Sequence, residues 1–310
     1  MDRKTSMGLC IADSLIEKRE FDPRDIMMRF ILWWCYGYNN TFRFDNKRSN
    51  KASVGLSGTT KQSLLLYIKN KGNNVYTKYG DKNSSGNGSL IRNAAIPICY
   101  FRNKEKAIEF AKKQSSITHQ GDQAAGCCQL LTYIIIKILN LKGKNTNTNS
   151  LNAKTYFEKS KISISKNQED LKLILDNLKD FKCKSVQALL FQEKNDKNKD
   201  WNWRNDDFKY NEERARYNPN IIGSYCMDGF AMALHILYTT NSFKEAILKS
   251  ANLCGDSGAV SSIVGQIAGA YYGLDYIPKD WIKTINQWDN NEIALRGYIL
   301  CHLDEMNIYN

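Results

Sequence analysis

Residues 86–92, with the sequence GNGSLIR, have the residue types of a phosphate-binding turn. Gly86 and Gly88 allow a ligand to approach the backbone closely, because neither carries a Cβ atom. Asn87 and Ser89 offer polar side chains. Arg92 adds a positive charge one turn into a predicted helix whose N-terminus favours anions. The segment therefore predicts either a diphosphate cradle or a glycine-rich helix cap, which is the plainer alternative.

Two other segments place small polar residues at the start of a predicted helix. In the sequence GLSGTT, the hydroxyls of Ser57 and Thr59 can cap the helix, and its free N–H groups can hold an anion. In the turn GDSG, Asp256 lies between two predicted helices. Its carboxylate can hold a cation, or else Asp256 or Ser257 can cap the helix that follows. Both alternatives stay open for each segment.

Four more residues could take part in a site. Asp13 lies near the end of an apolar helical stretch and Glu20 about two turns further on, which suits either a solvated helix-end pair or a buried polar site. His119 precedes a long predicted helix and can reach a ligand or bond a neighbouring carbonyl. Tyr225 begins another helix, where it can stack on a ring or fill the core, and its residue type favours the core.

The elements that must position these residues are helices, because apolar side chains recur at three- and four-residue spacing and strand-like alternation is scarce. The pattern predicts an all-α protein with a single domain over residues 1–310. The predicted helices cover residues 7–18, 23–34, 61–69, 88–100, 104–114, 122–141, 152–158, 167–180, 224–238, 242–251, 258–272 and 290–306.

Lysine and asparagine gather in predicted loops near residues 36–60, 70–86, 142–150 and 193–218, and in the last of these Trp201 and Trp203 are expected to fold onto the domain. The net charge of +12 raises the question of a nucleic-acid partner. The lysines, however, alternate with asparagines rather than with the aromatic residues of a single-strand platform, which argues against that partner.

Cysteine usage and hydropathy bear on location. The nine cysteines are an odd number with no C-x-x-C pair, which predicts reduced thiols in a cytoplasmic protein. The most apolar run, residues 130–141, is too short to cross a bilayer and contains Lys137, so no membrane partner is expected.

In this order along the chain, these segments resemble the ADP-ribosylglycohydrolase family, which includes the dinitrogenase reductase-activating glycohydrolases and the ADP-ribosyl-acceptor hydrolases. The likeness covers nearly the whole chain, from Gly8 to about Gly273. The matching segments are ADSLI (12–16) for the family's GDALG-like helix, GNGSLIR (86–92) for its GDGSxMR-like segment, SITH (116–119) for S-x-T-H, residues 223–237 and 242–253 for the helices before the last motif, and NLCGDSGAVSSIVGQIAGAYYG (252–273) for NLGGDTDTIAAIVGALAGAYYG.

The resemblance implies a compact, orthogonal all-α bundle that binds ADP-ribose beside two magnesium ions. It also implies hydrolysis of the glycosidic bond that links ADP-ribose to a side chain or small acceptor. Glu20 and Asp256 then become the candidate catalytic carboxylates. The residues that the resemblance assigns to ADP-ribose or an ADP-ribosylated protein are Asp13, Gly86, Asn87, Gly88, Ser89, Arg92, His119 and Tyr225.

The chain departs from the family where the metals are expected. The family's Thr-Asp-Asp-Thr box falls on residues 57–60, so both aspartates are replaced, and Gly258 replaces the second aspartate of the last box. Magnesium prefers several oxygen ligands, usually with carboxylates among them. Ser57, Thr59 and Asp256 are left as candidate ligands, which predicts a magnesium site that is weak, single or absent.

Three hypotheses follow. The first is a binding protein for ADP-ribose whose hydrolysis is weak or lost, and the second an active ADP-ribosyl hydrolase with a rearranged magnesium site. The third is a basic scaffold or nucleic-acid-associated protein that keeps only the fold, supported solely by the Lys/Asn loops. The missing aspartates favour the first, while the acceptor and the oligomeric state stay open.

Overall fold

The computed structural model describes residues 3–40, 47, 49–50, 52–53, 55–77, 85–143, 168–192, 200–210 and 225–306 of the chain. Within these residues the protein is built from helices without any strand, and an isolated β-bridge pairs Gly86 with Tyr225. The all-α fold that the spacing of apolar side chains predicted is therefore confirmed. The expected helix at residues 152–158 lies outside the described residues.

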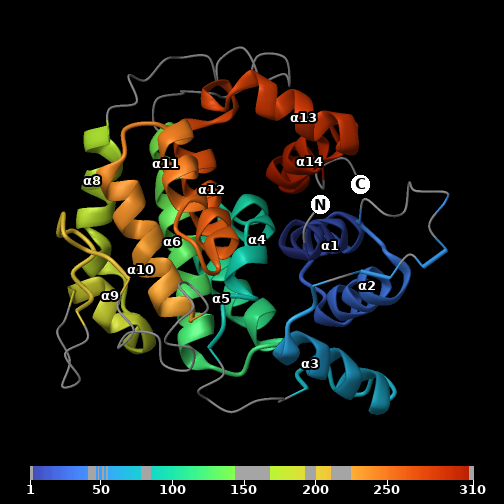
Figure 1. Ribbon diagram of the computed structural model, residues 1–310. Coiled ribbons are helices and arrows are strands. Elements are labelled where there is room, and N and C mark those ends of the chain that lie inside the picture. Colours follow the sequence, from blue (N-terminus) through green and yellow to red (C-terminus); the bar gives the residue numbers. More distant parts are fainter. Residues whose placement is uncertain are drawn as a thin grey trace.

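Thirteen described α-helices and four short 3-10 turns make up the fold (Figure 1). The α-helices are α1 (Arg3–Lys18), α2 (Pro23–Tyr36), α3 (Gly58–Lys69), α4 (Ala95–Cys99), α5 (Lys104–Ser116), α6 (Asp122–Gly143), α8 (Gln168–Asp176), α9 (Gln187–Phe191), α10 (Cys226–Thr239), α11 (Phe243–Ala251), α12 (Ser257–Tyr272), α13 (Lys279–Asp289) and α14 (Glu292–Met306). The 3-10 turns are η2 (Leu90–Arg92), η3 (Leu178–Asp180), η4 (Lys184–Val186) and η5 (Leu274–Tyr276).

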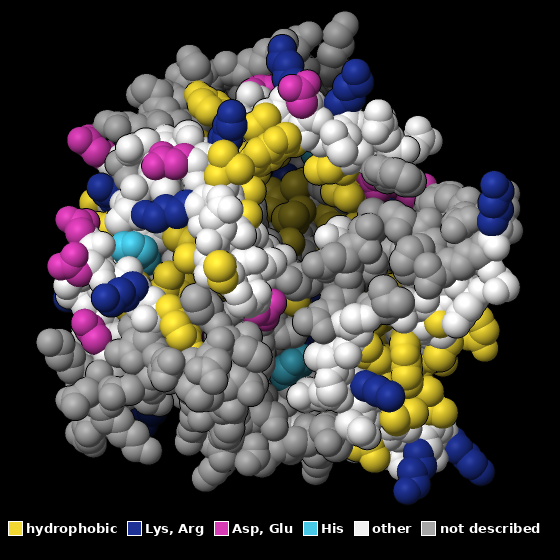
Figure 2. Space-filling view, viewed as in Figure 1, with side chains coloured by type: hydrophobic (Ala, Val, Ile, Leu, Met, Phe, Trp, Pro, Cys, Tyr) yellow, Lys and Arg dark blue, Asp and Glu magenta, His cyan; other side chains and the backbone are white. Residues whose placement is uncertain are grey.

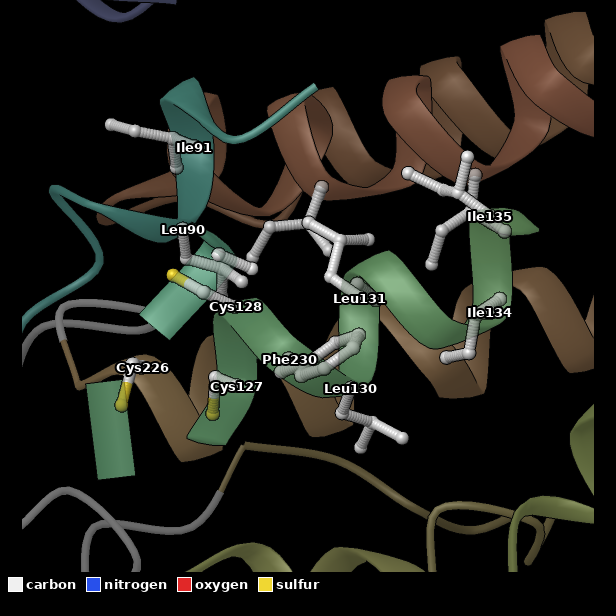
Figure 3. Close-up of a cluster of buried hydrophobic side chains, with 14 of the residues drawn as sticks. Leu90, Ile91, Cys127, Cys128, Leu130, Leu131, Ile134, Ile135, Cys226 and Phe230 are labelled. Atoms are coloured by element: carbon white, nitrogen blue, oxygen red, sulfur yellow. The ribbon is translucent and has the colours of Figure 1, made fainter. Parts of the chain in front are cut away.

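Helix α6 lies at the centre of the core and contacts α5, α10 and α12. Figure 3 shows its apolar side chains beside Leu90 of η2 and Phe230 of α10. Leu131 and Ile134 are fully buried, as are Leu90 and Phe230. Burial of such large apolar groups is the main source of folding free energy, so this cluster fixes the position of η2.

The stretch 122–141 of α6 corrects one expectation from the sequence. By length and composition alone, Asp122–Leu141 could cross a membrane, whereas no run of that length was expected. Most of it is buried inside the protein, with 72% of its most apolar window covered. A core helix meets the same criteria as a membrane span, and the burial is that of a core helix.

The segment η2–α4 connects two groups of helices: α4 lies between α12 on one side and α1 and α14 on the other (Figure 1). The turn η2 contacts α1, α6 and α12, while α4 contacts α1, α5, α6 and α14. A single helix was predicted over residues 88–100, but the structure divides it. Pro97 explains the division, because proline is tolerated in the first turn of a helix and would clash with the carbonyl of Asn93 in a continuous one.

Other features of the sequence can also be compared with the structure. Trp201 and Trp203 do fold onto the domain, where they are 3% and 0% exposed. All nine cysteines are free thiols, as predicted. Helices α9 and α13 were missed by the sequence reading. On the described part of the face shown in Figure 2, lysine and arginine side chains lie singly rather than in one basic patch.

Candidate functional site

The turn at residues 86–89 is attached to the start of α10. Gly86 pairs with Tyr225 in the isolated bridge, and the backbone N–H of Cys226 donates to the carbonyl of Ser85 at 3.0 Å. Segments that are far apart in sequence are thereby joined at the N-terminus of α10. The family resemblance placed Gly86 and Tyr225 in one site, and the structure does bring them together.

Asn87 is buried within this turn, with 4% of its surface exposed. Neither its amide nitrogen nor its amide oxygen has a hydrogen-bond partner among the described residues. Leaving a buried amide unpaired costs on the order of 1–3 kcal/mol for each lost partner. Such a cost suits a side chain whose partners come from a bound molecule or from ordered water.

Gly88 lies directly against the ring of His119. A Cβ atom added at Gly88 would be 2.7 Å from both Cε1 and Nε2 of His119, and 3.7 Å from Oγ1 of Thr60. No real Cβ atom makes so close a contact, so only glycine leaves room for the imidazole here. The turn at 86–89, the end of the SITH segment and the start of α3 therefore meet at one point.

His119 is held as a neutral ring. It is 3% exposed, and its Nδ1 lies 2.8 Å from Oγ1 of Thr118. Burial, together with the positive charge of Arg92, lowers the pKa of His119 to about 3. The imidazole therefore carries no charge near neutral pH and can act as a hydrogen-bond donor or acceptor through Nε2.

Ser89 faces the interior of the protein. Its hydroxyl accepts a hydrogen bond from Ser115 at 2.8 Å, and its carbonyl accepts one from Nε2 of Gln114 at 3.0 Å. The same Gln114 amide donates to Oδ1 of Asn93 at 3.0 Å. Gln114 thus anchors the turn, although no local pattern in the sequence marked it as functional.

Arg92 lies beneath the turn and is only 1% exposed. Its Nε donates to Oε1 of Gln114 at 3.1 Å, and its Nη2 donates to Oγ1 of Thr118 at 2.8 Å. The guanidinium also stacks over Phe30 at 4.6 Å, while its Nη1 is buried with no hydrogen-bond partner among the described residues. Burial lowers the pKa of Arg92 to about 10, which still leaves it charged at neutral pH. Its predicted contact with substrate stays a prediction.

Tyr225 is 6% exposed and donates its hydroxyl to Oε1 of Gln123 at 2.7 Å. Trp201 meets its ring edge-on with 6.4 Å between the ring centres. The side chain therefore fills the core at the base of the turn, which was the plainer alternative for this residue type.

Asp13 and Glu20 have very different surroundings. Asp13 accepts hydrogen bonds from Nε of Arg296 at 2.6 Å, from the amide of Asn39 at 2.6 Å and from the hydroxyl of Tyr38 at 2.7 Å. Burial alone would raise the pKa of Asp13, but these hydrogen bonds outweigh burial and lower it. Glu20, just beyond the end of α1, is exposed.

The segment 57–60 forms the N-terminus of α3. Ser57 is the N-cap residue: its hydroxyl accepts from the N–H of Thr60 at 3.4 Å and donates to the hydroxyl of Thr60 at 2.9 Å. Gly58 is exposed, and a Cβ atom added to it would meet nothing within 4 Å. The capping alternative predicted for Ser57 is therefore confirmed. Thr59, which is half-buried, keeps its metal role as a prediction.

Asp256 occupies the N-cap position of α12, after a turn in which Cys254 and Gly255 have φ angles of 63° and 58°. Its side chain makes no capping hydrogen bond, so the capping alternative does not hold for Asp256. The carboxylate is half-buried at the N-terminus of the helix, where a negative charge is favoured. Within the described residues, no group of three or more His, Cys, Asp and Glu side chains is placed to hold a metal ion.

Comparison with known proteins agrees with this geometry. The sequence profile of the ADP-ribosylglycohydrolase family matches residues 2–305. The ADP-ribosylarginine hydrolase Tri1 of Pseudomonas putida (strain GB-1) is 26% identical over 283 residues, which cover 91% of this chain and 61% of Tri1. The ADP-ribosylhydrolase ARH3 of Gallus gallus is 23% identical over 298 residues, which cover 93% of this chain and 74% of ARH3.

A solved structure, described as an ADP-ribosylglycohydrolase-related protein complex, superposes with a TM-score of 0.63 at 22% identity. The superposition covers 96% of this chain and 81% of the solved chain, and at that identity it supports the fold alone. The chain spans about three fifths of the length of Tri1. Since the family profile matches nearly every residue, the chain belongs to the ADP-ribosylglycohydrolase family.

Proposed function

We propose that this chain binds ADP-ribose or an ADP-ribosylated protein, and that its hydrolysis of the glycosidic bond is weak or lost. One contrast carries the proposal. The turn at 86–89 packs against His119 so closely that only glycine fits at position 88. The segments at 57–60 and 256–259 contribute a single carboxylate, that of Asp256.

The residues at hand do not fit a pair of magnesium ions. Each ion takes about six oxygen ligands, and a neighbouring pair needs several carboxylates to offset the repulsion between the ions. Gly58 has no side chain to offer, and the Ser57 hydroxyl is already used in capping α3. The described residues likewise hold no metal-binding group. No step of the proposed function therefore involves magnesium.

The described residues support the proposal of binding. The buried amide of Asn87 and Nε2 of His119 offer hydrogen bonds beside Gly88. Fixed, desolvated donors of this kind bind the phosphate and ribose oxygens of a nucleotide well, because they lose little freedom on binding.

An active hydrolase is the second candidate, and the exposed carboxylate of Glu20 favours it. The resemblance assigns this carboxylate to the activation of an attacking water. The relatives Tri1 and ARH3 are named as hydrolases, and Tri1 as one that acts on ADP-ribosylarginine. An arginine-linked substrate is therefore the first to test.

The deciding experiment combines calorimetric titration with ADP-ribose, with and without magnesium, and an assay of an ADP-ribosylarginine peptide. Binding without magnesium and without turnover is expected. Robust magnesium-dependent turnover would overturn the proposal in favour of the second candidate. In that case Glu20→Gln should lower turnover by about 100-fold or more while binding is retained.

A third outcome would remove both candidates. If ADP-ribose fails to bind and the protein instead binds RNA or DNA in a salt-sensitive way, the basic scaffold is the better description.

A further inference from the structure

A chain of hydrogen bonds leads from Arg92 to the ring of His119. Nη2 of Arg92 lies 2.8 Å from Oγ1 of Thr118, and the same oxygen lies 2.8 Å from Nδ1 of His119. Thr118 is fully buried, and His119 and Arg92 are 3% and 1% exposed. Bulk water therefore has little part in deciding where the protons of this chain lie.

The chemistry of the three groups decides the direction of each bond. A guanidinium has only donors, so Oγ1 of Thr118 must accept from Arg92. The hydroxyl proton of Thr118 then has Nδ1 of His119 as its acceptor within hydrogen-bond distance. A proton on Nδ1 would instead leave the buried hydroxyl proton of Thr118 without this acceptor. Nδ1 is therefore the acceptor, and the ring proton belongs on Nε2.

Other contacts hold the hydrogen-bonded residues Arg92, Thr118 and His119 in place. The hydroxyl of Ser63 on α3 donates to the carbonyl of Thr118 at 3.1 Å. Gln114 fixes the other end, because its side-chain oxygen accepts from Nε of Arg92 and its carbonyl accepts from Nη2. Only the planar fork of arginine can make this set of bonds, since a lysine offers a single nitrogen.

The last atom of this hydrogen-bond series, Nε2 of His119, lies at the candidate ligand site. This nitrogen of His119 lies over Gly88, at 2.7 Å from where a Cβ atom would be. Asn87 is the adjacent residue of the same turn, and its amide has no hydrogen-bond partner in the part of the chain that the structure describes.

We propose that Arg92 and Thr118 are positioning residues that hold His119 as the neutral Nε2–H tautomer, aimed as a hydrogen-bond donor at a ligand oxygen beside the turn at 86–89. The inference rests on the proposed function in one respect, which is that the ligand is ADP-ribose. Arg92 then acts through Thr118 rather than by touching the ligand, and His119 donates a hydrogen bond without transferring its proton. The positive charge of Arg92 also opposes protonation of the ring, which keeps the donor neutral.

The first test uses the unaltered protein and needs no ligand. Nitrogen NMR of protein labelled in its three histidines separates the two tautomers, and His119→Gln identifies the resonances of position 119. We expect an unprotonated Nδ1 and a protonated Nε2 throughout pH 5 to 8. A ring with its proton on Nδ1, or one that titrates within that range, would overturn the inference.

The second test compares Thr118→Val with Thr118→Ser. Valine keeps the shape but loses the hydroxyl, whereas serine keeps the hydroxyl. Thr118→Val should mix the tautomers and weaken ADP-ribose binding by about tenfold, in keeping with the loss of one well-placed hydrogen bond. Thr118→Ser should restore the single tautomer and bind within about threefold of the unaltered protein. Equal spectra and equal affinities for the two variants would contradict the positioning role.

The two proposals fail in different ways. If ADP-ribose does not bind but the Nε2–H tautomer is found, the positioning role stands and the proposed function is wrong. If ADP-ribose binds but the ring carries its proton on Nδ1, the binding function stands and the positioning role is wrong. The tautomer measurement also remains decisive if Thr118→Val does not fold.

Discussion

The turn at 86–92 and the two segments at 57–60 and 256–259 differ in almost every physical respect. Ser89, Arg92 and His119 are each no more than 3% exposed. Hydrogen bonds join Arg92 to Thr118, the residue before His119, and Ser115 to Ser89. Gly58 and Gly258 are exposed, and each stands where the resembled family has an aspartate. The turn at 86–92 belongs to a buried hydrogen-bond network. The segments at 57–60 and 256–259 form the N-termini of α3 and α12, where the two glycines offer no side chain.

This difference shows which part of the site the fold itself maintains. A buried network is needed for stability, because removing one member leaves the others unpaired in a low-dielectric interior. Exposed metal ligands carry no such penalty, so they can be replaced without unfolding the protein. Loss of the metal ligands, with the turn retained, is therefore the expected way for such a fold to lose catalysis and keep binding.

Removing the buried charge should have the largest effect. Arg92→Met preserves length and apolar contact with Phe30, but it leaves acceptors on Gln114 and Thr118 without donors. We expect a loss of about 2–4 kcal/mol in the free energy of unfolding, measured with urea at pH 7. The matched control Arg24→Met removes an exposed arginine and should change stability by less than about 0.5 kcal/mol. Equal losses in the two variants would mean that the network adds nothing to the fold.

A pair of glycine substitutions compares the two regions directly. Gly88→Ala places a methyl group 2.7 Å from two atoms of His119, which must move. It should cost about 1–3 kcal/mol of stability and weaken ADP-ribose binding by at least tenfold. Gly58→Ala meets nothing within 4 Å and lies in a helix, so it should be neutral or stabilise the protein by up to about 1 kcal/mol. A tolerated alanine at both positions would remove the contrast between the regions.

Acid should destabilise the protein through the turn region. The pKa of His119 is depressed in the folded state to about 3, from an ordinary 6.5. Between those values the unfolded chain binds a proton that the folded protein excludes, so stability falls as the pH falls. Between pH 6 and 5 the loss should be about 1 kcal/mol, seen in urea unfolding at both pH values and largely absent in His119→Gln. Asp13, whose pKa is lowered, acts in a separate window, because its contribution is lost only below its ordinary value of 3.8.

The fold could be predicted from the sequence where the helices are long. Helices such as α6 and α12 repeat their apolar spacing often enough to be recognised, whereas α9 contains five residues and shows no period. The four-residue spacing of Trp281 and Ile285 in α13 was a usable signal that was overlooked.

The site was accessible only in part. The resemblance brought Gly88 and His119 together, which no local pattern could have done across so many residues. The polar links beneath them, through Gln114 and Thr118, depend on tertiary packing that spacing does not encode. The same is true of Asp13, whose partner Arg296 lies 283 positions further along the chain.

Restoring the missing carboxylates should have the smallest effect of these substitutions. Gly58→Asp combined with Gly258→Asp restores two carboxylates, and neither glycine has a positive φ that would strain a side chain. Magnesium affinity should rise by about fivefold, measured by calorimetry, because added carboxylates strengthen an oxygen site for a hard cation. The matched control, asparagine at both positions, adds the same volume without charge and should bind no better than the unaltered protein.

Adding Ala259→Thr completes the family's box but inserts atoms at a fully buried position of α12, so it should cost stability by overpacking. If the double aspartate variant gains no affinity over the asparagine control, the segments at 57–60 and 256–259 do not converge on one ion. The alignment of the metal boxes would then be wrong, and the loss of aspartates could no longer support the proposal of weak hydrolysis.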